Sequence, residues 1–112
     1  MLNTEKNKSY CPLAHALELI GGKWKCLILF HLIEGPKRSG SLQKDVHGLS
    51  NKVFSETVRS LEKNDLISRT VYPTVPPKVE YKLTDLGISL IPILKALDDW
   101  GKKLDARTSS NL

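Results

Sequence analysis

Residues 41–83, SLQKDVHGLSNKVFSETVRSLEKNDLISRTVYPTVPPKVEYKL, contain the patterns that decide the fold. A short helix fits Ser41–Val46, and the His-Gly-Leu sequence at 47–49 predicts a tight turn after it. Ser50 is a suitable N-cap for a second helix, which we expect to run to about Asn64. This second helix has an apolar stripe at helical spacing, formed by Phe54, Val58 and Leu61. The stretch therefore begins as a helix–turn–helix.

Two β-strands are predicted after this pair of helices. Asn64-Asp65 can end the second helix in a left-handed turn, because both side chains tolerate that conformation. Residues 67–74 are rich in β-branched and aromatic side chains, and residues 79–83 alternate between apolar and charged. Val75-Pro76-Pro77-Lys78 between them predicts a stiff hairpin tip, since proline cannot donate a ladder hydrogen bond. A helix–turn–helix followed by such a hairpin describes a winged helix–turn–helix.

The flanking segments predict three more helices. Pro12 suits the first turn of a helix that ends at Gly21-Gly22, and a second apolar helix runs from about Lys23 to Gly35-Pro36. Thr84 is expected to cap one long final helix, in which Pro92 would cause a bend. The predicted fold class is α+β, mostly α, with an N-terminal helix and a long C-terminal dimerisation helix around the winged domain. We expect a flexible segment at residues 1–10, one domain at 11–105 and a polar tail at 106–112.

Length and composition narrow the function classes. A chain of 112 residues suits a single core with a radius of gyration of about 13 Å. No apolar run reaches the roughly 20 residues of a membrane span, and the first ten residues lack the apolar core of a signal peptide. With two cysteines the chain has no disulfide scaffold, so we expect a cytoplasmic protein. We find no nucleophile, phosphate-loop or dinucleotide motif and no paired metal ligands, so no enzyme, cofactor or metal site is predicted.

The charge distribution predicts that the binding partner is a polyanion. The net charge is +5, and residues 23–82 carry all of it, with 11 basic and 6 acidic side chains. We expect double-stranded DNA as the partner. The predicted contacts from the second helix of the helix–turn–helix, to base edges or phosphates, are Ser50, Asn51, Lys52, Ser55, Glu56 and Arg59. The predicted phosphate contacts from the segments before and after it are Lys37, Arg38, Lys44, Arg69, Lys78 and Lys82. The alternative is an ordinary solvated surface.

The final helix carries an apolar seam that predicts a homodimer. Its residues are spaced 4, 3, 4, 3 and 4 apart, as in a heptad pattern, and they are Leu86, Leu90, Ile93, Leu97, Trp100 and Leu104. We expect Leu13 and Leu17 of the first helix to assist this interface. A two-fold pair would place its recognition helices about 34 Å apart, so the operator should be an imperfect palindrome. The alternative is a helix that packs only on its own domain.

The two cysteines differ in their expected chemistry. Cys11 precedes a helix start, where the positive end of the helix dipole stabilises a thiolate and makes the thiol reactive. Cys26 lies in an apolar helix and is expected to be a small core residue. We therefore single out Cys11 as a redox-sensing candidate, with a small oxidant or electrophile as the signal. An inert surface thiol is the alternative.

Five segments together resemble the HxlR family of bacterial transcription regulators, which are related to MarR-like proteins. They are Cys11-Pro12, LELIGGKW at 17–24, LISRTVY at 66–72, VPPKVEYKLTDLG at 75–87 and DWG at 99–101. The resemblance covers roughly residues 10–104. It implies a homodimer formed by the first and last helices, operator binding by the 50–64 helix and the wing, and, in several members, oxidant sensing at the cysteine matching Cys11.

The chain departs from the family pattern at two places. Ser39 follows Arg38 where members usually have an aromatic residue, and Asp65 stands where a glycine is usual. Two other functions stay open at this point. One is a MarR-like regulator that responds to a small-molecule ligand instead of a thiol reagent. The other is a winged-helix module that binds proteins.

Overall fold

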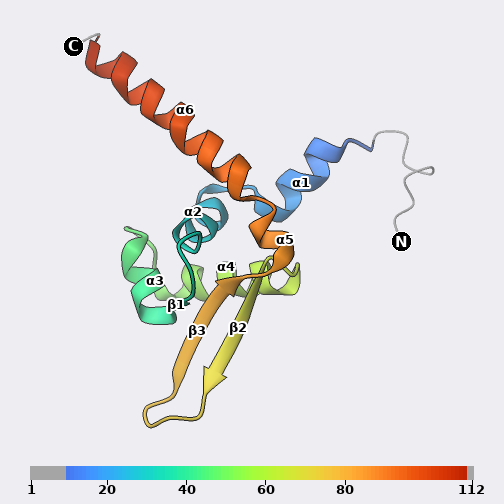
Figure 1. Cartoon of the computed structure of the whole chain (residues 1–112), viewed down its shortest axis with the longest axis vertical. Coiled ribbons are helices and arrows are strands. Elements are labelled where there is room, and N and C mark those ends of the chain that lie inside the picture. Colours follow the sequence, from blue (N-terminus) through green and yellow to red (C-terminus); the bar gives the residue numbers. More distant parts are fainter. Residues whose placement is uncertain (1–9, 111–112) are drawn as a thin grey trace.

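A winged helix–turn–helix with a short N-terminal helix and a long C-terminal helix is the fold of this chain, which confirms the predicted fold class. The computed structural model describes residues 10–110, so nearly all of the expected flexible segment lies outside this range. In chain order (Figure 1) the elements are α1 Pro12–Ile20, α2 Lys23–His31, β1 Lys37–Arg38, α3 Ser39–Asp45, α4 Asn51–Lys63, β2 Ile67–Tyr72, β3 Lys78–Leu83, α5 Asp85–Ile88 and α6 Ile91–Ser110.

The α3–turn–α4 unit forms as the sequence patterns predict. The Ser50 hydroxyl accepts a hydrogen bond from the backbone N–H of Val53 at 3.1 Å, which confirms the N-cap. Four side chains of α4 are buried in the core: Phe54, Thr57, Val58 and Leu61. Asp65 adopts a φ of 60° after the helix and so takes the left-handed position that usually favours glycine. Helix α3 begins at Ser39, two residues earlier than predicted, and ends at Asp45.

The wing belongs to a sheet of three strands, one more than predicted. The order is β1-β3-β2, and both pairs are antiparallel. Strand β1 has only two residues, so it shows no alternating pattern, and it forms by pairing Lys37 with Tyr81 and Arg38 with Glu80. Strand β2 ends at Tyr72 instead of Thr74. The sheet therefore joins the segment before α3 to the wing.

The predicted single final helix is wrong, because the chain forms two helices. The Thr84 hydroxyl caps α5 by accepting a hydrogen bond from Gly87 N–H at 3.1 Å, as expected. Helix α5 ends at Ile88, and α6 starts at Ile91 with Pro92 as its second residue. Proline lacks an N–H, and its ring collides with the carbonyl four residues earlier, so it fits the start of a new helix better than the interior of one. Helix α6 then runs to Ser110, and residues 106–110 of the expected tail are helical.

The segment Thr84–Gly87 packs closely on the base of the wing. A Cβ added to Gly87 would lie 2.2 Å from the carbonyl oxygen of Leu66, so only glycine fits this contact without a shift. The Thr84 hydroxyl also donates to the carbonyl of Asp65 at 2.6 Å. The start of α5 is therefore tied to the turn between α4 and β2.

The molecule is more extended than the compact domain that its length predicts. Its radius of gyration is 16.5 Å, whereas about 13 Å was expected from the length. The core is formed by α2, α3, α4, the base of the sheet and Leu94 of α6. Helices α1 and α6 extend from the core on the side opposite to the wing (Figure 1), and none of the α1 residues is buried.

Candidate nucleic-acid interface

Helix α4 has a buried face and a polar face, and the DNA contacts predicted for this helix and its cap are all exposed. The hydrogen bond to the Ser50 cap fixes the start of the helix, and Phe54 and Val58 hold its other face on the core. The predicted contact residues are all exposed: Ser50, Asn51, Lys52, Ser55, Glu56 and Arg59. Such a face can enter a major groove with its side chains toward base edges.

A polar groove runs between α4, α3 and the wing. Its volume is about 420 Å³, and it is lined by Asn51, Ser55 and Arg59 of α4 together with Arg69 of β2. The groove thus brings together three contacts predicted for α4 and Arg69, which was predicted separately as a contact of the wing. The sequence did not indicate Gln43 of α3, which lines the same groove and whose Nε2 donates to Asn51 Oδ1 at 2.5 Å. This bond ties α3 to the first turn of α4, and amide groups of this kind can read adenine.

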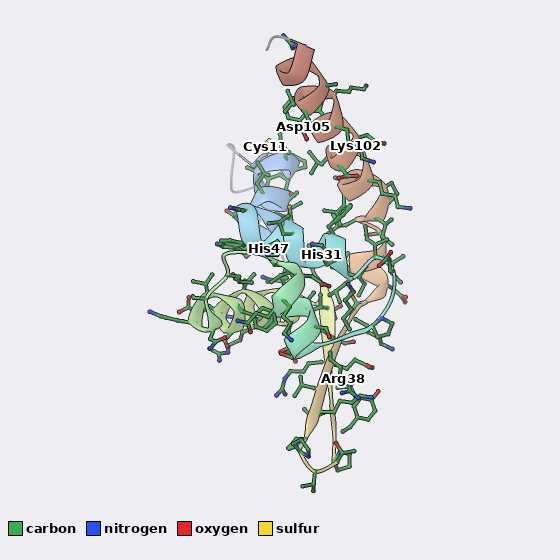
Figure 2. All side chains as sticks on the ribbon, turned by 90° about the vertical axis from the view of Figure 1, so that its left-hand side faces the viewer. Cys11, His31, Arg38, His47, Lys102 and Asp105 are labelled. Atoms are coloured by element: carbon green, nitrogen blue, oxygen red, sulfur yellow. The ribbon has the colours of Figure 1, made fainter. Side chains whose placement is uncertain are left out.

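The basic residues before and within α3 have different surroundings. Arg38 and Lys44 are exposed, and Arg38 lies beside the wing in Figure 2. Lys37 instead donates to Asp45 Oδ2 at 2.5 Å, and this hydrogen bond lowers the pKa of the Asp45 carboxyl. The ammonium of Lys37 therefore ties β1 to the end of α3, which gives it a structural contact that the sequence did not indicate.

The two faces of the wing carry different cations. Residues that are direct partners in an antiparallel pair lie on the same face of the sheet. Arg69 pairs with Tyr81, a buried residue, and so lies on the face toward α4. Lys78 pairs with Tyr72 and lies on the other face, as does Glu80 two residues later. The Lys78 ammonium is 4.4 Å from the centre of the Tyr72 ring and 4.0 Å from Glu80 Oε2.

Apolar side chains remain exposed on α1, α5 and α6. Trp100 is 60% exposed and Leu13 is 66% exposed, and the remaining exposed members of the predicted interface are Leu17, Leu86, Ile93, Leu97 and Leu104. Leu90 differs from the rest of the predicted seam, because it lies in the break between α5 and α6 and is partly buried against the core of its own chain. The predicted interface thus loses one residue to the core, and its other members remain exposed in the single chain.

The two cysteines differ in exposure, and Cys26 packs against the core without being fully buried in it. Cys11 is exposed at the N-cap position of α1, and its side chain makes no capping hydrogen bond. It lies on the same side of the molecule as Lys102 and Asp105 of α6, far from Arg38 (Figure 2). Cys26 is partly buried and donates to the carbonyl of Ile20 at 3.2 Å, and burial raises the pKa of its thiol. Cys11 is therefore the more accessible thiol.

The described part of the chain contains neither a candidate metal site nor a candidate membrane-spanning helix. No group of three or more His, Cys, Asp or Glu side chains within residues 10–110 could hold a metal ion. Among the helices described there, none has both the length and the apolar character to cross a bilayer.

Known proteins resemble this chain over most of its length. A family model described as HxlR-like helix-turn-helix matches residues 19–109. The HTH-type transcriptional regulator YkvN of Bacillus subtilis (strain 168) is 47% identical over 94 residues, which are 84% of this chain and 80% of YkvN.

Two solved structures resemble this chain in fold, and the descriptions of both refer to a redox state or an oxidant. The redox regulator HypR in its reduced form has a TM-score of 0.82 at 35% identity, covering 89% of this chain and 99% of the HypR chain. The diamide-treated form of YodB from B. subtilis has a TM-score of 0.67 at 32% identity, covering 85% of this chain and 95% of that chain.

Proposed function

This chain belongs to the HxlR-like helix-turn-helix family of transcriptional regulators, and we propose that it binds an imperfectly palindromic DNA operator as a homodimer. The single observation that carries this proposal is the polar groove between α4, α3 and the wing. The groove collects Asn51, Ser55, Arg59 and Arg69 beside a helix whose other face is fixed in the core. A recognition helix needs both a rigid support and free polar side chains.

The dimer is supported by the surface that the single chain leaves uncovered. Large apolar side chains grouped on an exposed surface often mark a protein–protein interface, and α1 and α6 expose several of them on the side opposite to the wing. A two-fold axis on that side would leave both copies of α4 and both wings free. Two α4 helices about 34 Å apart would then enter successive major grooves on one side of the duplex.

The DNA-contacting residues divide into two groups by the kind of contact that they make. Arg59, Asn51 and Ser55 would contact base edges, because they lie on the exposed face of the recognition helix. Arg38, Lys44 and Lys78 would contact phosphates, and such contacts are salt-sensitive and independent of sequence.

A gel-shift titration tests DNA binding and its specificity together. Duplexes tiled across the region upstream of this chain's own gene are compared with shuffled duplexes of the same composition, at several salt concentrations. We expect one tiled segment to bind more tightly than its shuffled version, and affinity to fall steeply with salt. Equal binding to tiled and shuffled duplexes would remove the specificity claim, and no binding at low salt would remove the DNA-binding claim.

We further propose that oxidants or electrophiles change DNA binding through Cys11. The thiol is exposed at the start of α1, beside the surface proposed to form the dimer. An adduct, a sulfenate or an intersubunit disulfide at that position would change how two subunits pack. Because each recognition helix must fit its own groove, a small rotation of one subunit would weaken binding.

Matched cysteine variants test this response. Diamide is added to the parent, to Cys11→Ser and to Cys26→Ser, and operator binding is followed by gel shift. We expect the parent and Cys26→Ser to respond and Cys11→Ser to be insensitive. If Cys11→Ser responds to diamide as the parent does, Cys11 is not the sensor.

A further inference from the structure

Tyr72, Lys78 and Glu80 form a small cluster near the tip of the wing. The phenol O–H of Tyr72 donates to Glu80 Oε1 at 3.1 Å, and Glu80 Oε2 lies 4.0 Å from the Lys78 ammonium. The same ammonium lies 4.4 Å from the centre of the Tyr72 ring. The hydrogen bond to Glu80 also raises the pKa of the Tyr72 hydroxyl. Each of the three side chains thus contacts the other two.

This cluster leaves both charged side chains only partly exposed. The side chains of Lys78 and Glu80 are 31% and 25% exposed, whereas an unpaired lysine at a hairpin tip would extend into water. An ammonium held over an aromatic ring beside a carboxylate has part of its charge satisfied inside the protein. Lys78 therefore cannot contact a phosphate at full strength without changing its contact with Glu80.

The position of Glu80 in the sheet favours a functional contact. Within the described sheet, the pairing register puts Glu80 on one face with six other residues, none of them acidic: Arg38, Ser68, Thr70, Tyr72, Lys78 and Lys82. Arg38 and Lys78 are two of the proposed phosphate contacts. Glu80 is the direct partner of Arg38 in one ladder and lies two residues from Lys78 in the strand. A carboxylate at this position can compete with a DNA phosphate for the Lys78 ammonium, which it contacts in the unbound protein.

We propose that Glu80 is a positioning residue of the wing. Its carboxylate holds the Lys78 ammonium in the unbound protein, and a DNA phosphate takes the place of this carboxylate when the wing binds DNA. This inference rests on the proposed DNA-binding function and adds a regulatory contact to it. The carboxylate lowers the affinity of the wing for every duplex alike, because phosphates are the same in all sequences. A duplex is then bound tightly only if it also makes the base contacts of α4. Glu80 therefore reduces the amount of protein bound to random DNA.

The conservative variant Glu80→Gln separates charge from shape. Its amide oxygen can still accept the hydrogen bond from Tyr72, but the negative charge beside Lys78 is gone. We expect affinity for a random-sequence duplex to rise about two- to fivefold for each wing that binds, the range for a partly exposed ion pair. We also expect a steeper salt dependence, by up to about one unit per wing in the slope of log affinity against log salt, because each Lys78 then neutralises a phosphate fully.

A double-mutant cycle distinguishes this role from general electrostatics. The parent, Glu80→Gln, Lys78→Ala and the double variant are titrated by fluorescence anisotropy with a mixed-sequence duplex of about 30 base pairs, long enough for two half-sites. Removing any carboxylate raises DNA affinity somewhat, so Glu34→Gln, an exposed residue in the turn after α2, serves as the matched charge control. Thermal unfolding of each variant confirms that it is folded.

The inference predicts that Glu80→Gln raises affinity more than Glu34→Gln does, and that the excess disappears when Lys78 is alanine. An equal gain with and without Lys78, or no gain above Glu34→Gln, would overturn the inference while leaving the proposed function intact. A parent protein that binds no duplex at low salt would overturn the proposed function, and this inference with it.

Discussion

Leu97 tests whether the exposed seam of α6 forms the dimer. Its surface is 50% exposed in the single chain. Burying a whole leucine side chain stabilises by about 1.5–3 kcal/mol, so covering the exposed half contributes about 0.75–1.5 kcal/mol per subunit. A two-fold interface uses the residue twice, so Leu97→Ala should weaken the dimer by up to about 1.5–3 kcal/mol. That loss corresponds to a dimer Kd raised about 10- to 100-fold.

Sedimentation velocity over a range of protein concentrations measures this change. Alanine has the highest helix propensity, so the substitution should leave α6 intact, and far-UV circular dichroism checks this. Val71→Ala is the matched control, because Val71 of β2 is also 50% exposed but lies on the wing, and its dimer Kd should not change. Leu97→Asp would place a charge in the interface and should sediment as a monomer. If a Leu97→Asp variant sediments as a dimer like the parent, the exposed apolar residues of α6 do not form the dimer interface.

Three other substitutions test the interface and the fold. Arg59→Ala should reduce the preference for operator over random duplex by about 1–3 kcal/mol, as measured by anisotropy with both duplexes; an equal loss on both would make Arg59 a phosphate contact. Gly87→Ala should lower the free energy of unfolding by about 1–3 kcal/mol in urea titrations, because its Cβ meets the Leu66 carbonyl; an unchanged value would contradict this. Because Lys37 lowers the pKa of Asp45, the carboxylate stabilises the fold above its ordinary pKa and stops doing so as pH falls through the lowered one. The urea midpoint of Asp45→Asn should therefore fall less between neutral and acid pH than that of the parent. If the midpoints of the two proteins change with pH in the same way, the contact of Asp45 with Lys37 does not stabilise the fold.

The parts of the fold that could be predicted are those with local signals. Helix α4 has a cap at Ser50 and a stripe spaced every three or four residues, so its bounds were predicted to within one residue. The alternation in Val79–Leu83 and the proline pair at the tip predicted the hairpin in the same way. Each of these signals depends only on residues near one another in the chain.

The parts that could not be predicted depend on contacts between distant residues. A two-residue strand such as β1 has no period to detect and exists through its pairing with β3. The heptad spacing counted residues straight through the break between α5 and α6, because spacing does not record whether the helix is continuous; Pro92 was the available signal, and it marked a new start instead of a bend.

The candidate site shows the same division. The exposed polar face of α4 follows from helical periodicity and was predicted. The contact of Lys37 with Asp45 joins residues eight positions apart, and the contact of Tyr72 with Glu80 crosses the hairpin, so neither has a sequence pattern of its own. Basic residues could therefore be counted from the sequence, but which of them are already paired could not.

Helix α6 acts as a lever, because Leu94 anchors its first turns in the core while the rest of the helix extends away from the core (Figure 1). Helix α6 has 20 residues and is therefore about 30 Å long. A rotation of about 5° at the anchored end moves the far end of such a helix by about 2.6 Å. With the far ends held in a dimer, the same rotation would instead move each wing and α4 together, since Thr84 ties α5 to the turn between α4 and β2. The movement that a chemical change at the dimer surface causes in the DNA-binding elements then depends on the length of α6. Inserting one helical turn into α6 would increase this movement.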